Sequence, residues 1–246
     1  MSATASHTYH QQEEAILQAA ARCIEASSLL DFTMSAISKE VGLSMGSIYK
    51  HIQSKEDVLL ALGHRSRLHF EALVRKVVAL PLPIAARLVA VQLVDAEHAS
   101  PFSFGAELTT LLANEAILRR GSRGWLDKYL AADMAVEQLF YEQLARAFDE
   151  GEIVGPAERK ATLVDAINTA TWSLCVGYLQ VVRQRGARAL ATNTTRLEVD
   201  STIVRALQRL LNTYEWREPL TDAWIAKTNE TLEQIGLRTR GRGHAK

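Results

Sequence analysis

The stretch GLSMGSIYKHIQSKEDVL, residues 42–59, decides how the rest of the chain is interpreted. It gathers small residues, one tyrosine and several potential cations within a few helical turns. Ser44 and Ser54 each precede a helical pattern, and serine is a preferred N-cap residue. Gly42 follows a short helical segment, and glycine at a helix exit readily takes the left-handed conformation. The stretch therefore predicts a helix ending near Val41, a tight turn, a very short helix and then a long one.

This order of elements is that of a helix-turn-helix, whose second helix lies in the major groove of DNA. The first residues of the second helix are small or flexible, which permits close approach to DNA: Ser44, Met45, Gly46 and Ser47. The residues that follow can donate hydrogen bonds or positive charge to phosphate oxygens: Tyr49, Lys50, His51 and Lys55. Backbone amides at the helix start also favour a phosphate. A DNA-binding surface is therefore predicted on this small face.

The overall composition neither supports nor excludes a nucleic-acid partner. The 246 residues contain 28 Lys and Arg against 28 Asp and Glu, with 48% apolar residues, as in a globular protein of one or two domains. Cys23 and Cys175 are expected to be small buried residues in a reducing cytoplasm. The N-terminus lacks a basic region followed by an apolar core, and prolines interrupt the apolar run at 77–94. We therefore expect a soluble, cytoplasmic protein without a membrane span.

Helical periodicity extends over almost the whole chain, whereas strand signals are nearly absent, so the fold is predicted to be all-α. Helices are expected at about 11–29, 33–41, 44–51, 54–80, 84–98, 102–118, 123–150, 157–185, 199–216 and 220–235. Residues 10–56 form the predicted helix-turn-helix domain, and a fourth helix at about 54–80 connects it to a larger helical domain at 81–236. The basic, glycine-containing end at 237–246 is predicted to be disordered.

Residues 13–62 resemble the N-terminal domain of the tetracycline-repressor (TetR) family. The matching features are ILQAA at 16–20, Thr33 at the opening of the second helix, Ile37 within it, VGLSMGSIY at 41–49 and SKEDVL at 54–59. The chain departs from the family pattern at two points. It reads SSLLDF at 27–32, where the family usually has a glycine, and it has Ile52 in place of the usual aromatic residue. Neither change removes a DNA-binding donor.

The resemblance assigns roles to individual positions of the helix-turn-helix. It implies phosphate contacts by Thr33, Tyr49, His51 and Lys55. It implies that Met45, Ser47 and Lys50 face the bases, with Ser35 as a contributor from the second helix. Each of these residues also has an ordinary alternative as a packed or solvated side chain, but their joint occurrence favours DNA binding.

Two segments of the C-terminal part carry broad apolar stripes: residues 161–182 and 199–214. The resemblance implies that the corresponding helices form a four-helix bundle with a second copy of the chain. The predicted dimer residues are Leu163, Ile167, Leu174, Val181, Ile203, Leu207 and Leu210. The alternative is that these stripes fill the core of a monomer.

The resemblance also implies a ligand pocket in the C-terminal domain. Candidate wall residues are large and lie on different predicted helices: Phe102, Phe104, Trp125, Met134, Trp172 and Tyr178. Pockets are mostly apolar with a few placed polar groups. Such aromatic residues also occur commonly in ordinary helical cores.

These observations predict a ligand-responsive transcriptional regulator that binds double-stranded DNA. The predicted form is a repressor that binds a palindromic operator as a homodimer and is released by a small-molecule effector. The alternative is a ligand-independent DNA-binding or adaptor protein whose C-terminal domain only dimerises or recruits partners. The chain has no sequence motif of a metal, nucleotide or nucleophile site, so no enzymatic activity, catalytic residue, metal or cofactor is predicted.

Overall fold

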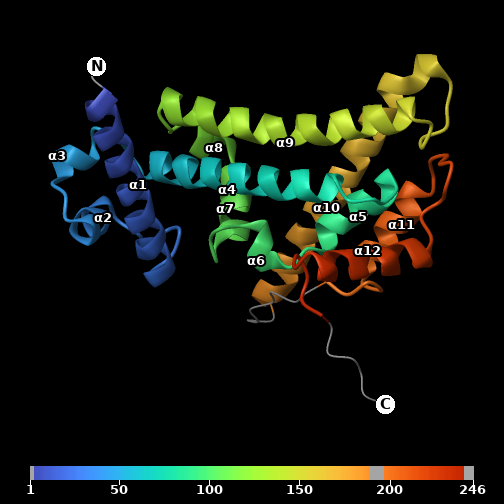
Figure 1. Ribbon diagram of the computed structural model, residues 1–246. Coiled ribbons are helices and arrows are strands. Elements are labelled where there is room, and N and C mark those ends of the chain that lie inside the picture. The colour runs from blue at the N-terminus through green and yellow to red at the C-terminus, as the bar shows by residue number, and fades with distance from the viewer. Residues whose placement is uncertain (1–2, 189–196, 241–246) are drawn as a thin grey trace. The chain divides into compact units, whose positions relative to one another are not determined.

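The computed structural model describes residues 3–188 and 197–240, and this part of the chain contains helices but no named β-strand (Figure 1). The predicted all-α fold is thereby confirmed. The helices are α1 Ala3–Ala26, α2 Met34–Val41, α3 Met45–Ile48, α4 Lys55–Val78, α5 Ile84–Leu93, α6 Ala96–Ala99, α7 Gly105–Leu112, α8 Glu115–Leu118, α9 Arg123–Asp149, the short 3₁₀ helix η1 Ala157–Arg159, α10 Lys160–Arg188, α11 Thr202–Leu211 and α12 Asp222–Gln234. None of the described helices combines the length and apolarity of a membrane span.

Several of the predicted helices differ from those observed. The first begins at Ala3 instead of about residue 11. The helix predicted at 84–98 is divided into α5 and α6, and the one predicted at 102–118 into α7 and α8. The second division has a local cause, because the Asn114 side chain caps α8 by accepting a hydrogen bond from the Ala116 N–H at 2.9 Å.

The chain forms two compact units, which divide it differently from the predicted domains. The first contains residues 1–70 and 100–135, and the second contains residues 71–99 and 136–246. Each of the long helices α4 and α9 begins in the first unit and ends in the second. The predicted DNA-binding segment is therefore packed together with α7, α8 and the start of α9 in one core.

The core of the first unit is built from the apolar faces of these helices. Residues spaced by one helical turn on α1, including Ile16 and Ala20, are fully buried, as are Ile37 of α2 and Ile48 of α3. Trp125 of α9 completes this core from the other side. Burying these faces together fixes α2 and α3 on α1.

Gly63 of α4 shows how closely the helices of this unit approach. A Cβ atom at this position would lie 2.3 Å from the Leu112 side chain and 3.1 Å from the Tyr129 ring. Any larger residue must therefore displace the end of the Leu112 side chain and crowd the Tyr129 ring. Sequence spacing does not reveal this close approach, because the partners lie far along the chain.

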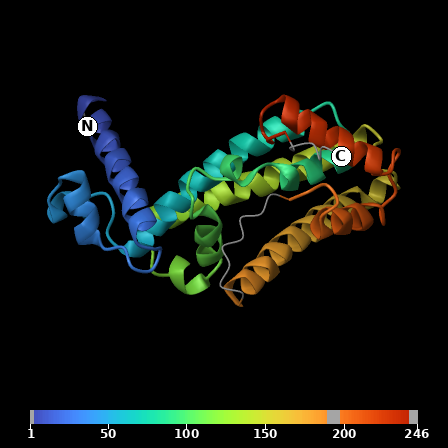
Figure 2. The same cartoon turned by 90° about the horizontal axis from the view of Figure 1, so that it is seen from below.

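The second unit is organised around α5, a helix with almost no polar face. Seven of its residues are buried, because α5 packs against both α11 and α12. Helix α11 is strongly amphipathic and buries Ile203 and Leu207, and it also packs against α10 (Figure 2).

The predicted disorder of residues 237–246 is wrong for the first two of them. Leu237 and Arg238 are 8% and 2% exposed. Arg238 donates hydrogen bonds to the backbone oxygen of Leu93 and, at 2.6 Å, to that of Leu197. Asp95 in turn accepts hydrogen bonds of 2.7 Å from the backbone N–H and the hydroxyl of Thr239. These bonds attach the segment to the end of α5, while the predicted disorder of residues 241–246 lies outside the described residues.

Candidate nucleic-acid interface

Helix α2 and the turn after it are held by hydrogen bonds at both ends. The Thr33 hydroxyl accepts a hydrogen bond from the Ala36 N–H at 3.0 Å. At the other end Gly42 has a φ of 71°, and its N–H bonds the Ser38 oxygen. The Ser38 hydroxyl donates to the Leu43 oxygen at 2.6 Å. A residue with a Cβ atom is disfavoured at this φ, so Gly42 supports the sharp turn that leads into α3.

Helix α3 is a single turn whose inward and outward faces are clearly different. The Ser44 hydroxyl accepts a hydrogen bond from the Ser47 N–H at 3.2 Å and so caps the helix. Ile48 is fully buried, whereas Tyr49 is 46% exposed and Lys50 is also exposed. The outward face can therefore meet a DNA groove while the inward face holds the helix on the core. We call α2, α3 and the first turn of α4 the reading head.

The other predicted DNA-binding residues of α2 and α3 also lie on accessible parts of the reading head. Thr33, Ser35, Ser44 and Gly46 are exposed, and Met45 and Ser47 are partly exposed. Helix α3 is shorter than predicted, since it ends at Ile48 and not near residue 51. The base-facing and phosphate-facing roles of these residues stay predictions.

The structure leaves little of the His51 side chain accessible for its predicted phosphate contact. This residue is only 7% exposed, and its ring lies against the ring of Tyr9 on α1, with the ring centres 4.1 Å apart and the planes tilted by 33°. Its Nε2 lies 3.3 Å from the side-chain oxygen of Gln12. Burial lowers the pKa of His51 below its ordinary value of 6.5; the nearby Lys50 also lowers it, and Glu13 raises it in part. His51 is therefore packed between α1 and the residues that follow α3.

Tyr9 is the residue that the sequence pattern failed to single out at this position. Besides covering His51, its hydroxyl donates a hydrogen bond of 3.2 Å to the backbone oxygen of Lys50. The N-terminal turns of α1 thus hold the end of the recognition helix. A signal was present, because Tyr9 precedes Ile16 by about two helical turns and so lies on the same side of α1, although it is 38% exposed.

Lys55, a predicted phosphate contact, also stabilises the reading head. Its Nζ donates to the Leu30 oxygen at 2.8 Å and lies 4.6 Å from the centre of the Phe32 ring. These contacts hold the loop between α1 and α2. An ammonium group has three donors, so this arrangement leaves donors for a phosphate oxygen.

The first turn of α4 is joined to the start of α9 by a buried carboxylate. Asp57 is fully buried, and its Oδ2 accepts a hydrogen bond from the Gln53 N–H at 3.0 Å. Its Oδ1 accepts one from the Ser122 N–H at 2.6 Å. The Trp125 indole N–H donates to the backbone oxygen of His51 at 3.1 Å. The start of α9 is therefore bonded directly to the reading head.

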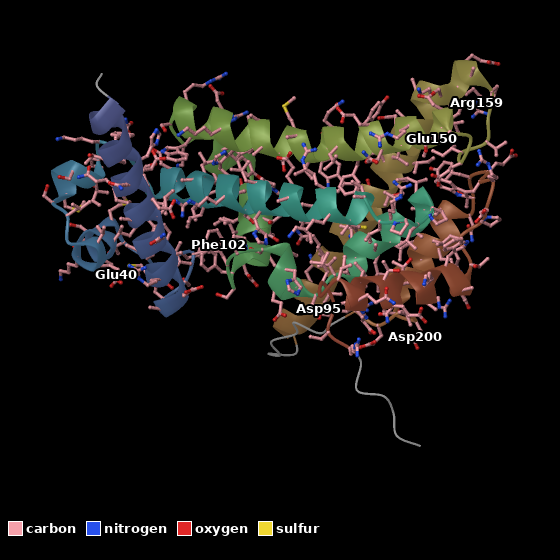
Figure 3. All side chains as sticks on the ribbon, viewed as in Figure 1. Glu40, Asp95, Phe102, Glu150, Arg159 and Asp200 are labelled. Atoms are coloured by element: carbon pink, nitrogen blue, oxygen red, sulfur yellow. The ribbon has the colours of Figure 1, made fainter. Side chains whose placement is uncertain are left out.

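This position of Trp125 is not that of a ligand-pocket wall. Phe102, labelled in Figure 3, and Phe104 are two further predicted wall residues. Their rings stack with centres 5.2 Å apart, and both pack against the core of the first unit. All three belong to the unit that carries the reading head. All three side chains therefore pack in or against the core of the first unit.

The other three predicted pocket residues have different surroundings. Met134 is 66% exposed, and Trp172 on α10 is 51% exposed. Tyr178, also on α10, is partly buried. The structure does not bring the six predicted residues together around one cavity.

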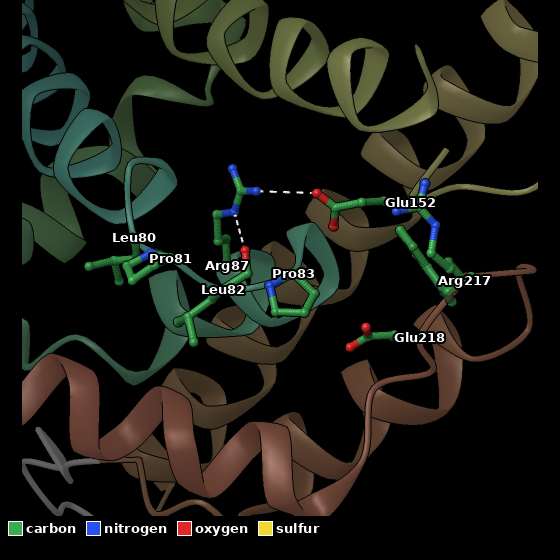
Figure 4. Close-up of a pocket in the computed structure, with 9 residues that line it drawn as sticks. Leu80, Pro81, Leu82, Pro83, Arg87, Glu152, Arg217 and Glu218 are labelled. Atoms are coloured by element: carbon green, nitrogen blue, oxygen red, sulfur yellow. Dashed lines mark hydrogen bonds and ion pairs between the residues drawn. The ribbon is translucent and has the colours of Figure 1, made fainter. Parts of the chain in front are cut away.

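A cavity of about 370 Å³ lies elsewhere in the second unit (Figure 4). The Arg87 guanidinium bonds the Val78 oxygen at 2.9 Å and the Leu82 oxygen at 2.6 Å, and lies 3.4 Å from the Glu152 carboxylate. Glu152 also accepts the N–H of Ile84 at 2.7 Å. The cavity is lined by Leu80, Pro81, Leu82, Pro83, Arg87, Glu152, Trp216, Arg217 and Glu218. The leucines, prolines and Trp216 give it apolar walls, while the two arginines and two glutamates supply charged groups. Binding sites for small molecules combine apolar walls with a few polar groups.

Three of the predicted dimer residues are core residues of the protomer, so the monomer-core alternative is correct for them. Ile167, Ile203 and Leu207 are at most 1% exposed. Val181 is 44% exposed, and the remaining three are partly buried: Leu163, Leu174 and Leu210.

An apolar stripe that α10 does expose was not among the predicted dimer residues. Trp172, Val176 and Leu179 are 51%, 46% and 46% exposed. Their spacings of four and three residues place them on one helix face. We call these three residues the α10 stripe. Apolar side chains gathered on one exposed face are typical of an interaction surface.

Comparisons with known proteins agree with this geometry. Residues 16–62 match the family model described as bacterial regulatory proteins, tetR family. This match confirms the resemblance found in the sequence. No curated protein sequence matches the chain significantly.

Several solved structures share the fold at low sequence identity. The superantigen PfiT is 18% identical with a TM-score of 0.55, covering 82% of this chain and 95% of its own. SmeT in complex with triclosan is 18% identical with a TM-score of 0.50, covering 86% and 95%. The regulator FadR from Bacillus subtilis in complex with stearoyl-CoA is 15% identical with a TM-score of 0.51, covering 81% and 95%.

Proposed function

We propose that this chain, whose N-terminal domain is that of the tetR family of bacterial regulatory proteins, is a ligand-responsive repressor. In this proposal a homodimer binds a palindromic operator in the cytoplasm and is released by a small-molecule effector. The observation that carries the proposal is the capped turn of α3, which exposes Tyr49 and Lys50 while Ile48 anchors it in the core. A short helix held in this way can present its first residues to base edges.

The α10 stripe supports the dimeric form of the proposal. A second copy that packs its own stripe against Trp172, Val176 and Leu179 would remove these side chains from water. Such a pairing is two-fold symmetric, since the same surface is used on both chains. A two-fold dimer places two reading heads on two half-sites about 34–36 Å apart, or a multiple of this distance.

The cavity of the second unit supports the ligand-responsive form over the ligand-independent alternative. Its volume of about 370 Å³ is within the range of sites for small molecules. Two proteins with the same fold have been solved with small molecules, triclosan in SmeT and stearoyl-CoA in FadR. An effector changes operator affinity when it binds the DNA-competent and incompetent conformations with different affinity.

The proposal is tested by selecting genomic DNA fragments with the purified chain and footprinting the enriched site. We expect a short inverted repeat, protected on both half-sites. Tyr49→Ala and Lys50→Ala are expected to lose this protection while the dimer stays folded. Lys76→Ala is the control, because Lys76 is exposed near the end of α4 in the second unit. An absence of enrichment over random fragments would contradict the DNA-binding role.

The regulatory part of the proposal has a separate test. Small-molecule extracts of the source cells are added to the complex of the chain with its selected operator, and the released fraction is measured. We expect one fraction to release the DNA, and substitutions that fill the cavity, such as Pro83→Trp, to remove this response. A complex that no fraction releases favours the ligand-independent alternative.

A further inference from the structure

The turn between α8 and α9 carries three arginines within five residues. Arg119, Arg120 and Arg123 have side chains that are 75%, 73% and 85% exposed, and we call them the arginine cluster. The segment 115–128 holds four basic and two acidic residues. Counted with Glu56, which pairs with Arg120, this surface has four basic against three acidic residues, a local excess of one positive charge in a chain of zero net charge. The cluster is therefore a basic surface that the helix-turn-helix motif does not account for.

The arginine cluster is fixed beside the reading head by direct bonds within the first unit. The Ser122 N–H, in the middle of the cluster, bonds Asp57 at 2.6 Å, and the Trp125 indole bonds the His51 oxygen at 3.1 Å. His51 follows the predicted DNA-facing Lys50 in the chain. The start of α9 also lies beside the first turns of α4 in Figure 1.

Arg120 is the member of the cluster that is connected most directly to a predicted DNA contact. Its guanidinium lies 3.6 Å from the carboxylate of Glu56. Glu56 follows Lys55 in the first turn of α4. Arg120 therefore contacts the same first turn of α4 that carries Lys55.

The ion pairs of the arginine cluster are exposed, so a phosphate can replace the carboxylate partner of each arginine. Arg119 pairs with Glu115 at 2.7 Å and Arg123 with Asp127 at 2.9 Å, both four residues apart on exposed helix surfaces. Exposed pairs of this kind contribute little to stability, because solvent screens them. A guanidinium binds a phosphate with two parallel hydrogen bonds, which makes phosphate a competitive partner.

We propose that the arginine cluster is a second DNA-contacting surface, which binds the phosphates flanking the operator half-site. The inference rests on the proposed DNA-binding function. The cluster contacts the backbone of the DNA and not its bases, so it increases affinity and lengthens the contacted site without reading sequence. Each bound phosphate releases counterions, so the cluster also steepens the salt dependence of binding.

The experiment measures the affinity of the full chain for a duplex selected by the wild-type protein, over a series of salt concentrations. The slope of log K against log salt becomes shallower by about 0.9 for each phosphate that the protein no longer neutralises. We expect the triple variant Arg119→Ala, Arg120→Ala, Arg123→Ala to make the slope shallower by roughly one to three. It should also lose backbone protection outside the inverted repeat in a hydroxyl-radical footprint.

A matched control removes the same charge from the second unit. Arg75, Arg146 and Arg159 are exposed there, and Figure 3 labels the last of them. Their joint replacement by alanine should leave the slope near the wild-type value. Replacing the cluster by three lysines keeps the charges and should restore most of the slope. The inference is overturned if the cluster variant and the control have the same slope and footprint. Failure of the wild-type chain to select any duplex would instead overturn the proposed function.

Discussion

The buried carboxylate of Asp57 accepts a hydrogen bond of 2.6 Å from the backbone N–H of Ser122, so that the first turn of α4 and the first turn of α9 share one anchor. Its other oxygen accepts the N–H of Gln53. Each buried donor that loses its partner costs about 1–3 kcal/mol. We expect Asp57→Ala to lower the free energy of unfolding by about 2–5 kcal/mol, measured by urea denaturation. Asp57→Asn keeps one good acceptor and should lose about half as much; equal losses would contradict this account.

Tyr9 holds the residues that follow α3 in two ways: its ring lies against the His51 ring, and its hydroxyl donates a hydrogen bond to the Lys50 oxygen. Tyr9→Ala removes both contacts, and we expect it to lower the free energy of unfolding by about 1–2 kcal/mol. Tyr9→Phe retains the ring contact with His51, so its free energy of unfolding should fall by less than that of Tyr9→Ala. The measurement is the urea midpoint of both variants. If Tyr9→Phe lowers the free energy of unfolding as much as Tyr9→Ala does, the ring contact with His51 contributes nothing to stability.

The buried His51 predicts how stability depends on pH. Its pKa in the folded chain is lowered below 6.5, mainly by burial, so the unfolded state binds the proton more readily. Stability is therefore fully present above the unfolded value and decreases as the pH falls through 6.5 towards the folded pKa. We expect His51→Phe to reduce the loss of stability between about pH 7.5 and about pH 5.5. Part of the loss should persist, because burial also lowers the pKa of His64.

Arg238 joins the last described residues to the end of α5 and to Leu197. Arg238→Ala leaves two backbone oxygens without this donor and opens space in a buried site. We expect it to lower the free energy of unfolding by about 2–4 kcal/mol in urea denaturation. Arg240→Ala is the control, because Arg240 is exposed and should change stability little. Similar losses in both variants would contradict the anchoring role of Arg238.

The α10 stripe predicts which substitution separates the proposed dimer. Leu179→Glu places a charge on an apolar face that is 46% exposed in the protomer. We expect sedimentation velocity to show monomers at concentrations where the wild-type chain is dimeric, because burying an unpaired carboxylate opposes association. Val154→Glu is the control, since Val154 is 47% exposed but lies outside α10. Dimers of unchanged stability in Leu179→Glu would place the interface elsewhere.

The sequence predicted the parts of the reading head that depend on local rules. The caps at Thr33 and Ser44 and the left-handed Gly42 act within four residues, so residue type and spacing were sufficient. The burial of His51 could not be predicted in the same way. It depends on Tyr9, which lies in helical turns beyond the expected start of α1.

The candidate sites of the C-terminal part were harder to predict, because an apolar pattern does not say what it packs against. Ile167 and Trp172 both lie on α10, yet the first is buried in the protomer and the second is exposed. Trp125 was expected in a pocket and lies under the reading head. Such assignments depend on contacts between residues far apart in the chain, which spacing alone does not contain.

The hydrogen bond between the Trp125 indole and the His51 oxygen makes the fluorescence of Trp125 sensitive to the position of the reading head. Of the four tryptophans, Trp125 is the one in the first unit, while Trp172, Trp216 and Trp224 belong to the second. A chain in which the other three are replaced by phenylalanine would emit from an indole bonded directly behind the recognition helix. Its emission wavelength would then report, without any attached dye, whether the recognition helix shifts when DNA or an effector binds.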